Sequence, residues 1–317
     1  MKAVTISRYG GNEVVEVADV PVPTPGEDDV LIKVHAASVN PVDWKIRNGM
    51  LKLFTGRSFP KILGSECAGE VVETGANVRQ FKKGDFVIGY PGIKRLAAFA
   101  EYVCADKGST FVKPGNVSSE EASTLPIAGL TALRALRDLG KVAEGGHVLI
   151  NGASGGVGTF AVQIAKILGA RVTAVCSASN AALVQDLGAD RVLDYAHEDF
   201  TKGGERFDVV FDAIAKRSFA ECKRAMTAKG VYVSTLPSPS VLLNQYLTRF
   251  FTRKTAKAVM VKPNAADMEW MKKYIEAGKL RVVVDKVFSL EQIKEAFIYS
   301  ESGKAKGKIV VRTGESE

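Results

Sequence analysis

The segment 151–158, which reads NGASGGVG, is the part of the chain whose residue types and spacing point most directly to chemistry. It follows a strand-like run and opens an apolar helical pattern that extends to Leu168. Small residues let the backbone turn tightly and approach a pyrophosphate, and the amides and dipole at the start of the next helix attract negative charge. The segment predicts a dinucleotide-binding turn, with Gly155 and Gly158 in two glycine positions and Ala153 in the first. A glycine-rich turn without a ligand is the alternative.

The residues downstream of this turn favour one coenzyme over the other. An acidic residue about 20 positions further on would hydrogen-bond the adenosine ribose of NAD and repel a 2′-phosphate, but no Asp or Glu occurs between Gly152 and Gln185. The second predicted strand is followed by serine and asparagine instead, so we expect NADP, bound as NADPH. The residues expected from this motif to bind the coenzyme are Ala153, Ser154, Gly155, Gly156, Val157, Ser177 and Asn180.

The elements that must position the turn follow a regular rhythm from residue 124 onward. Strands at 147–151, 171–175, 191–193, 207–211, 231–234 and 258–261 alternate with helices, which predicts a doubly wound parallel sheet. Before it, short strand patterns at 14–20, 30–37, 70–73, 86–88 and 100–104 are typical of a small barrel or sandwich. A last predicted strand at 308–312 suggests that the chain returns to this first region. We therefore expect one domain over 1–123 and 263–317, and a second over 124–262.

Composition narrows the classes of function. A chain of 317 residues with 46% hydrophobic content is long enough for two buried cores. Its apolar runs are shorter than the roughly 18 residues that cross a bilayer, and its N-terminus lacks the pattern of a secretory signal, so we expect a cytoplasmic protein. The net charge is +8, but no aromatic-interleaved RNA-binding motif accompanies it, and we do not expect nucleic-acid binding. The four scattered cysteines are interpreted as buried thiols.

Several segments together carry a resemblance to a known family. They read SVNPVDWK at 38–45, LPIAGLTA at 125–132, the glycine turn, LGAD at 187–190 and GKIVV at 307–311. In these segments the chain resembles the zinc-free quinone oxidoreductase branch of the medium-chain dehydrogenase/reductase superfamily, close to chloroplast-envelope quinone oxidoreductase-like and alkenal reductase proteins. The resemblance implies an α/β protein with a GroES-like β-barrel catalytic domain, a Rossmann domain and an active cleft between them. By family analogy it also implies a homodimer, joined at the edge of the Rossmann sheet near residues 259–261.

The resemblance also implies that no metal takes part. Zinc-bearing relatives have a cysteine at the position of Asn40 and a histidine before the glutamate that is Glu66 here, where this chain has Ser65. No Cys/His pair has the spacing of zinc ligands. Without a Lewis acid, conjugated acceptors are favoured, because the charge that arrives with hydride delocalises to an oxygen that hydrogen-bond donors can stabilise. We therefore expect a quinone, alkenal or other enone as substrate.

Four polar residues match positions that line the nicotinamide site in the family: Asn40, Asp43, Lys45 and Thr131. Lys45 stands where many quinone oxidoreductases have tyrosine, and its ammonium could donate to the developing enolate or fix the nicotinamide ribose. For Asn40 and Asp43 the alternative is a capped turn that organises the backbone. For Thr131, which we also expect to contact the coenzyme, the alternative is a residue at a helix start.

Two further features are interpreted through the resemblance. Tyr195 resembles a family tyrosine on the adenosine side of the coenzyme, and the alternative is an ordinary aromatic residue at a sheet edge. A helical pattern places Leu242, Leu243, Tyr246, Leu247, Phe250 and Phe251 on one apolar face. That face serves either core or dimer packing or as a substrate wall.

The predicted function is therefore NADPH-dependent hydride transfer to a conjugated carbonyl. Two alternatives stay open. One is an enoyl-thioester reductase on the same scaffold. The other is a non-enzymatic NADPH-binding protein that contacts RNA or an anionic membrane through its positive charge.

Overall fold

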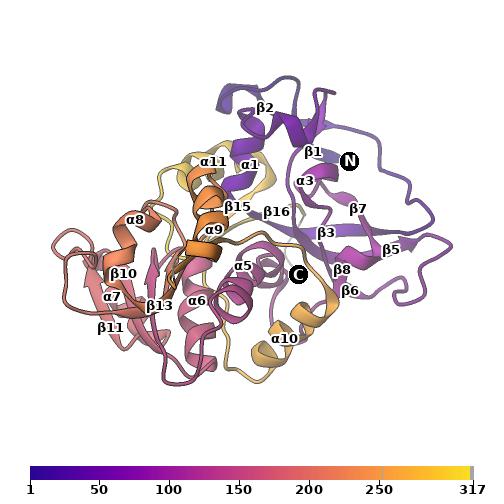
Figure 1. Cartoon of the computed structure of the whole chain (residues 1–317). Coiled ribbons are helices and arrows are strands. Elements are labelled where there is room, and N and C mark those ends of the chain that lie inside the picture. The colour runs from indigo at the N-terminus through magenta and orange to yellow at the C-terminus, as the bar shows by residue number, and fades with distance from the viewer. Residues whose placement is uncertain (252, 315–317) are drawn as a thin grey trace. The chain divides into compact units, whose positions relative to one another are not determined.

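The computed structural model describes residues 1–251 and 253–314. For residues 249–251 it describes the backbone alone. The chain forms two compact units (Figure 1). Unit 1 contains Met1–Ile127, Pro263–Glu276 and the described residues from Val283 onward, and unit 2 contains Ala128–Lys262 and Ala277–Val282. The sequence predicts one domain over 1–123 and 263–317, and the short segment 277–282 is an exception because it belongs to unit 2. Gln163 explains the exception, because its side chain accepts from the amide of Arg281 at 2.9 Å and donates to its carbonyl at 2.9 Å.

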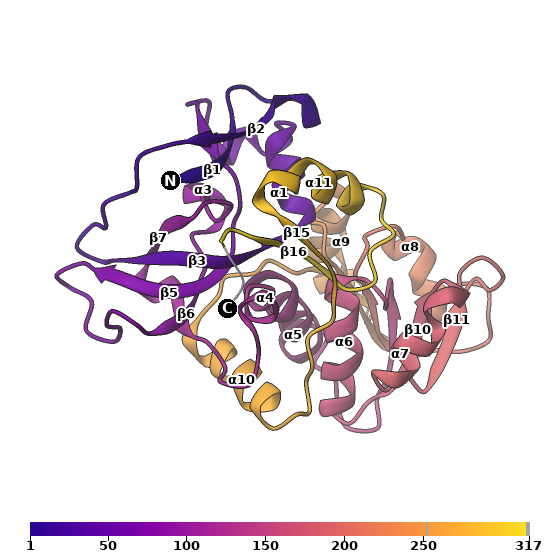
Figure 2. The same ribbon diagram turned by 180° about the vertical axis from the view of Figure 1, so that it is seen from behind.

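Unit 1 is built on a seven-stranded sheet in which the C-terminal strand lies beside an N-terminal one. The order is β15-β16-β3-β5-β6-β8, and β7 also pairs with β3. β16 runs antiparallel to β3, with Val311 opposite Ala37, and Figure 2 shows these two strands together. The strands are β3 (Asp29–Val39), β5 (Cys67–Thr74), β6 (Phe86–Gly89), β7 (Tyr102–Asp106), β8 (Thr110–Val112), β15 (Val284–Ser289) and β16 (Lys308–Arg312). A second sheet has the order β2-β1-β4, formed by β1 (Lys2–Ile6), β2 (Val15–Asp19) and β4 (Lys61–Ile62).

β3 contributes to the core of unit 1 on both of its faces, because almost every one of its residues is buried. The rings of Phe99, in the segment before β7, and Phe297, in α11, meet edge to face with centroids 6.0 Å apart. Truncation of such a ring to alanine costs about 3–5 kcal/mol of stability. The helices of this unit are α1 (Pro41–Arg47), α2 (Lys52–Thr55), α3 (Gly92–Arg95), α4 (Ser119–Ala122), α10 (Ala265–Glu276) and α11 (Ile293–Glu301).

Unit 2 is the predicted doubly wound domain. Its six strands are all parallel and have the order β11-β10-β9-β12-β13-β14. The chain starts in the centre at β9 and winds outward in both directions, so the topological switch point lies between β9 and β12. The strands are β9 (His147–Asn151), β10 (Arg171–Cys176), β11 (Arg191–Asp194), β12 (Phe207–Asp212), β13 (Met226–Ser234) and β14 (Thr255–Ala258). The helices are α5 (Leu130–Leu133), α6 (Gly156–Ile167), α7 (Ala181–Asp186), α8 (Phe219–Cys222) and α9 (Pro239–Phe251).

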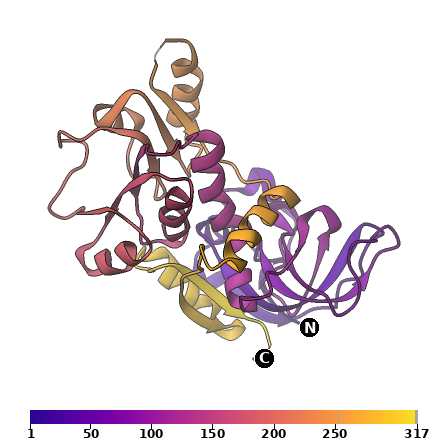
Figure 3. The same cartoon turned by 90° about the horizontal axis from the view of Figure 1, so that it is seen from below.

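The last strand of this sheet differs from the sequence prediction. We expected residues 258–261, but β14 is Thr255–Ala258, with Thr255 opposite Val231 and Ala258 opposite Ser234. The apolar run after it suggested a strand, yet Met260 is 70% exposed. Contact with α9, which runs alongside β14 in Figure 3, sets the position of the strand.

Two smaller observations complete the fold. Cys67, Cys176 and Cys222 are buried free thiols, whereas Cys104 is only half-buried, which corrects the expectation that all four are buried. Among the described residues, no helix is both long and apolar enough to span a bilayer.

Candidate functional site

The glycine turn lies between β9 and α6, as the sequence predicts, and two of its glycines are required by packing. Gly152 has a φ of +83°, a left-handed conformation that L side chains rarely adopt. At Gly158 an added Cβ would lie 2.1 Å from the carbonyl oxygen of Gly152, so no side chain fits there. Gly155 is different, because its φ is −82° and the nearest atom to an added Cβ is 3.5 Å away. The fold itself does not require a glycine at 155, and the space beside its Cα is open.

The electrostatics of this turn suit an anion. Gly155 is the N-cap of α6, and no acidic residue occupies the first turn of the helix. The first amides of a helix have no acceptor within it, and its dipole places partial positive charge at that end. A phosphate group placed here would meet donors and favourable charge. The residues present therefore fit a dinucleotide.

The other predicted coenzyme residues gather at the carboxyl ends of β9, β10 and β11. The side-chain amide of Asn180 donates to Ser154 Oγ at 3.0 Å. The hydroxyl of Ser177, directly after β10, is 3.0 Å from that of Ser179. The amide of Tyr195 donates to the carbonyl of Cys176 at 3.2 Å, and its side chain is 64% exposed. Ala153 is fully buried, so only its backbone is available to a ligand.

Sequence reasoning missed Asp212, a buried carboxylate at the end of β12. It accepts from Asn151 Nδ2 at 2.9 Å and from the backbone amide of Arg217 at 2.8 Å. Burial raises the pKa of this carboxyl. It holds the loop that places Ile214 against Gly152. The signal available in the sequence was an Asp at the end of an apolar strand, opposite an Asn at the end of its neighbour.

Thr131 does not start a helix. It is the second residue of α5, which continues π-helical turns at Leu125–Gly129 and leads into another at Arg134–Leu139. Its side chain is buried, with 7% exposure. The capping alternative is therefore wrong. Interruptions of π type frequently accompany functional sites, which is compatible with the predicted role.

In unit 1, Asn40 and Asp43 form the capped turn that we weighed as the alternative to a direct catalytic role. The backbone amide of Asn40 donates to Asp43 Oδ2 at 2.7 Å, and Ser65 Oγ donates to Asp43 Oδ1 at 3.0 Å. Asn40 is the N-cap and Pro41 the first residue of α1, an arrangement that starts a helix firmly. Both polar side chains are buried. Their immediate effect is to fix the start of α1, which carries Lys45.

A buried ion pair, also missed from the sequence, completes this network. Asn40 Nδ2 donates to Glu66 Oε1 at 2.7 Å, and Lys308 Nζ donates to Asn40 Oδ1 at 2.6 Å and lies 3.4 Å from Glu66 Oε1. Ser38 Oγ also donates to Glu66 Oε1, and the amide of Ile127 donates to Glu66 Oε2 at 2.7 Å. Such a pair is tolerable in an interior because its polar atoms are hydrogen-bonded.

The burial of this network shifts several pKa values. Burial, together with the charge of Glu66, raises the pKa of Asp43 to about 7. The hydrogen bonds that Asp43 accepts from Asn40 and Ser65 oppose this shift. Burial lowers the pKa of Lys308. Burial and the charges of Glu66 and Asp43 raise the pKa of Tyr90 to about 12. Tyr90 therefore remains a neutral phenol at physiological pH.

The same residues do not fit a zinc ion. By the family resemblance, Asn40 and Ser65 stand where zinc relatives have cysteine and histidine. The ammonium of Lys308 already contacts Asn40 and Glu66, and it would repel a second cation. Within the described residues, no group of three or more His, Cys, Asp or Glu is placed to hold a metal.

Lys45 is the side chain in this region best suited to proton chemistry. It is half-buried on α1, with its ammonium 5.4 Å from the centre of the Trp44 ring. It forms no ion pair with any described carboxylate, and burial lowers its pKa. A lowered pKa makes an ammonium a better proton donor near neutral pH.

The apolar face of α9 is exposed in unit 2. The exposed fractions are 47% for Leu242, 58% for Leu243, 65% for Tyr246 and 39% for Leu247. The side chains of Phe250 and Phe251 lie outside the described residues. These four residues are therefore not core within unit 2, which leaves dimer packing or a substrate wall.

Comparison with known proteins covers the whole chain. Residues 26–115 match the alcohol dehydrogenase GroES-like domain, and residues 187–311 match a model described as zinc-binding dehydrogenase. The chain is 38% identical to the chloroplastic quinone-oxidoreductase QR1 of Triphysaria versicolor, over 98% of both chains. It is 35% identical to 2-methylene-furan-3-one reductase of Solanum lycopersicum, over 98% of this chain and 79% of that one.

A solved structure supports the same relationship. The quinone oxidoreductase from Coxiella burnetii superposes with a TM-score of 0.91 at 32% identity, over 99% of both chains. These matches confirm the α/β class, with a GroES-like domain and a Rossmann-type sheet. The protein belongs to the medium-chain dehydrogenase/reductase superfamily, among its quinone oxidoreductases and their relatives.

Proposed function

We propose that this protein is an NADPH-dependent oxidoreductase that transfers hydride to quinones or other conjugated carbonyl compounds, such as alkenals and enones, without a metal ion. The observation that carries the proposal is the turn at residues 152–158, where Gly155 is open to a ligand at the start of α6. The names of the relatives, a quinone oxidoreductase and a furanone reductase, support the class of acceptor.

The coenzyme is proposed to be NADP. Its pyrophosphate would rest on the amides of Gly155, Gly156 and Val157, with Ser154 beside them. The polar groups of Ser177 and Asn180 and the exposed ring of Tyr195 suit the adenosine side, and no carboxylate in the loop after β10 repels a 2′-phosphate. A smaller dissociation constant for NADPH than for NADH supports this preference, and an equal or larger one contradicts it.

In the proposed reaction the protein supplies position and electrostatics. Bound NADPH supplies the hydride. As hydride reaches the conjugated carbon, negative charge develops on the acceptor oxygen, and Lys45 donates a hydrogen bond and then a proton to it. Asn40 and Asp43 hold the start of α1 and so position Lys45. Thr131 is proposed to contact the nicotinamide.

An acceptor screen tests this function. NADPH oxidation is followed by absorbance with quinones, alkenals, enones and an enoyl-CoA, on protein whose metal content has been measured. Turnover of quinones or enones by metal-free protein is the expected result. Turnover confined to enoyl-CoA supports the thioester alternative. No oxidation with any acceptor, together with salt-dependent binding of RNA or anionic vesicles, supports the non-enzymatic alternative.

Assembly and location complete the proposal. We propose a homodimer that acts in the cytoplasm. Cell fractionation tests the location, because several relatives are named chloroplastic or mitochondrial.

A further inference from the structure

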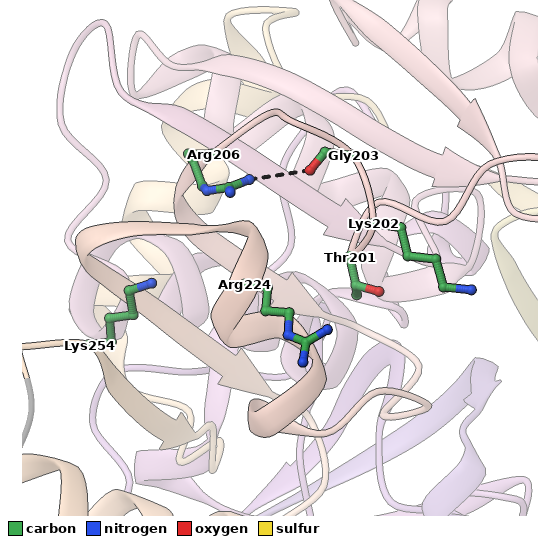
Figure 4. A pocket seen from close by; sticks show the side chains of 6 residues that line it. All are labelled: Thr201, Lys202, Gly203, Arg206, Arg224 and Lys254. Carbon is green, nitrogen blue, oxygen red and sulfur yellow. Dashed lines mark hydrogen bonds between the residues drawn. The ribbon is translucent and has the colours of Figure 1, made fainter.

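Unit 2 has a basic depression of about 530 Å³, lined by Thr201, Lys202, Gly203, Arg206, Arg224 and Lys254 (Figure 4). Its position separates it from the coenzyme turn. Arg206 precedes the first residue of β12, Arg224 precedes β13, and Lys254 precedes β14, so these side chains start from the amino ends of three neighbouring parallel strands. The glycine turn follows the carboxyl end of β9. In a parallel sheet all strands have their amino ends on one side and their carboxyl ends on the opposite side, so the depression and the turn lie on opposite sides.

Neither arginine of the depression has a carboxylate partner among the described residues. Arg206 Nη1 donates to the carbonyl oxygens of Gly203, Gly204 and Glu205 at 3.3, 3.2 and 3.0 Å. These acceptors are neutral, so they orient the guanidinium and leave its charge. The guanidinium of Arg224 forms no hydrogen bond or ion pair with any residue that the structure describes.

Two acidic residues of the neighbouring loop, Asp199 and Glu205, each pair with an arginine that does not line the depression. Asp199 accepts from the amide and hydroxyl of Thr201 at 3.0 and 2.8 Å and pairs with Arg217 at 3.4 Å, while Lys202 is more distant at 3.9 Å. Glu205 pairs with Arg191 at 2.9 Å. No Asp or Glu lines the depression. An anion placed there meets a net positive charge.

The lining also narrows the class of ligand. It contains no aromatic or large apolar side chain, so it offers no apolar surface to a base or ring. Arginine recognises phosphate by paired hydrogen bonds, and lysine acts as a point charge. Four cations spread around one depression match a ligand with more than one anionic group.

We propose that this depression is a second anion-binding site, which takes ligands with two or more clustered phosphates. The source of the phosphates is a soluble polyphosphate or a phosphorylated lipid headgroup. The site goes beyond the proposed function and does not rest on it, because it lies away from the coenzyme turn.

Titration calorimetry with inorganic pyrophosphate, on protein saturated with NADPH, tests the proposal. Saturation keeps the probe out of the coenzyme turn. The test variant is Lys202→Gln with Arg224→Gln, because Arg206 also organises its loop and is left unchanged. The matched control is Lys82→Gln with Lys83→Gln, which removes two exposed charges from unit 1. Circular dichroism and NADPH affinity report whether each variant is folded.

The expected result is one pyrophosphate per chain, with a dissociation constant that rises about tenfold or more in the test variant and stays unchanged in the control. No binding to the NADPH-saturated protein, or an equal loss in both variants, overturns the proposal. Sedimentation with phosphatidylcholine vesicles containing phosphatidylinositol bisphosphate, lost in the test variant, identifies a lipid source. Pyrophosphate binding without such sedimentation identifies a soluble one.

Discussion

At the scale of single residues, the proposed chemistry depends on Lys45, an ammonium without a carboxylate partner among the described residues. Most surface lysines are fully hydrated and titrate near 10.4, whereas burial lowers the pKa of this one. Its place on α1, directly after the capped turn of Asn40 and Asp43, gives it a fixed origin. Burial also lowers the pKa of Lys257 and Lys308, so its place on α1 is what separates Lys45 from these two lysines.

Replacement of Lys45 by methionine is expected to lower kcat by about a hundredfold or more, because general acid catalysis contributes that much. The dissociation constant for NADPH is expected to change by less than about threefold, because the loss concerns the transition state. Stopped-flow kinetics and coenzyme titration measure the two effects separately.

Lys45→Arg is the matched control for charge. The wild-type rate is expected to fall as the pH rises through the lowered lysine pKa. Arginine stays charged over the same range, so the rate of the Lys45→Arg variant is expected not to change with pH. If the methionine variant turns over like the wild type, Lys45 has no part in the reaction.

Asp43 gives a prediction about stability and pH. Its folded pKa of about 7 lies above the unfolded value of about 3.9, so the folded protein holds a proton that the unfolded chain releases between these values. The stability that this proton contributes is present below about pH 4 and is lost as the pH rises through about 7.

The Asp43→Asn variant cannot titrate, and its amide can accept from the backbone amide of Asn40 through oxygen and donate to Ser65 Oγ through nitrogen. Relative to it, the wild type is expected to lose up to about 1.4 kcal/mol of unfolding free energy per pH unit in this window. Urea unfolding at several pH values measures the difference. A difference that stays constant, or that favours the wild type as the pH rises, would show that the carboxyl is ionised throughout.

At the scale of elements, the turn between β9 and α6 separates glycines needed for folding from one that is open to a ligand. Gly158→Ala is expected to lower stability, because its Cβ would meet the Gly152 oxygen at 2.1 Å. Gly155→Ala is expected to keep the melting temperature while weakening NADPH binding by about tenfold or more, since a methyl group would stand where the pyrophosphate approaches.

Gly115→Ala is the control for this pair, because an added Cβ there has no neighbour within 4 Å. Thermal melts and coenzyme titration on the three variants check the prediction. Full NADPH affinity in Gly155→Ala would mean that no coenzyme rests on this turn.

The buried pair of Glu66 on the segment before β5 and Lys308 on β16 gives a second prediction for elements. Glu66→Gln or Lys308→Met alone is expected to cost about 3–5 kcal/mol, because each leaves the partner's charge buried and unpaired. The combined variant is expected to cost less than the sum, and denaturant unfolding gives the coupling energy. Additive losses would mean that the two charges do not stabilise each other.

How far the sequence predicts these elements depends on how local their cause is. β9 and β16 begin and end where the sequence predicts, because alternation and flanking turns mark them. β14 was misplaced, because its position depends on pairing with β13 and contact with α9. The network around Asn40 shows the same limit, since Glu66 and Lys308 are 242 positions apart and meet only through the pairing of β16 with β3. The glycine turn was predictable, because every residue that forms it is local.

At the scale of the whole molecule, α9 limits how the proposed dimer can form at the edge of the parallel sheet. By family analogy we expected two copies to join at the edge of the parallel sheet near residues 259–261, but the edge strand is Thr255–Ala258. The amide of Ala256 donates to Thr248 Oγ1 at 3.2 Å and that of Ala258 to Gln245 Oε1 at 3.0 Å. These bonds occupy donors that a second strand would use.

If the dimer forms at this edge, Thr248→Ala with Gln245→Ala is expected to lower its dissociation constant several-fold, because two amides become available to the partner strand. Sedimentation velocity distinguishes a tighter dimer from aggregation. The single exposed substitution Lys229→Ala, away from α9, serves as the control. A monomer at all concentrations contradicts the dimer, and an unchanged dissociation constant contradicts this interface.

The proposed activity depends on the transfer of hydride from a phosphorylated nicotinamide coenzyme to a conjugated acceptor bound by this protein. NADPH carrying deuterium at the transferable position of its nicotinamide ring, incubated with an enone and metal-free protein, tests it most directly. We expect one deuterium on the β-carbon of the reduced product, the carbon that was conjugated to the carbonyl in the enone, detected by mass spectrometry and NMR. Product without the label, or no product at all from any conjugated acceptor, would contradict it.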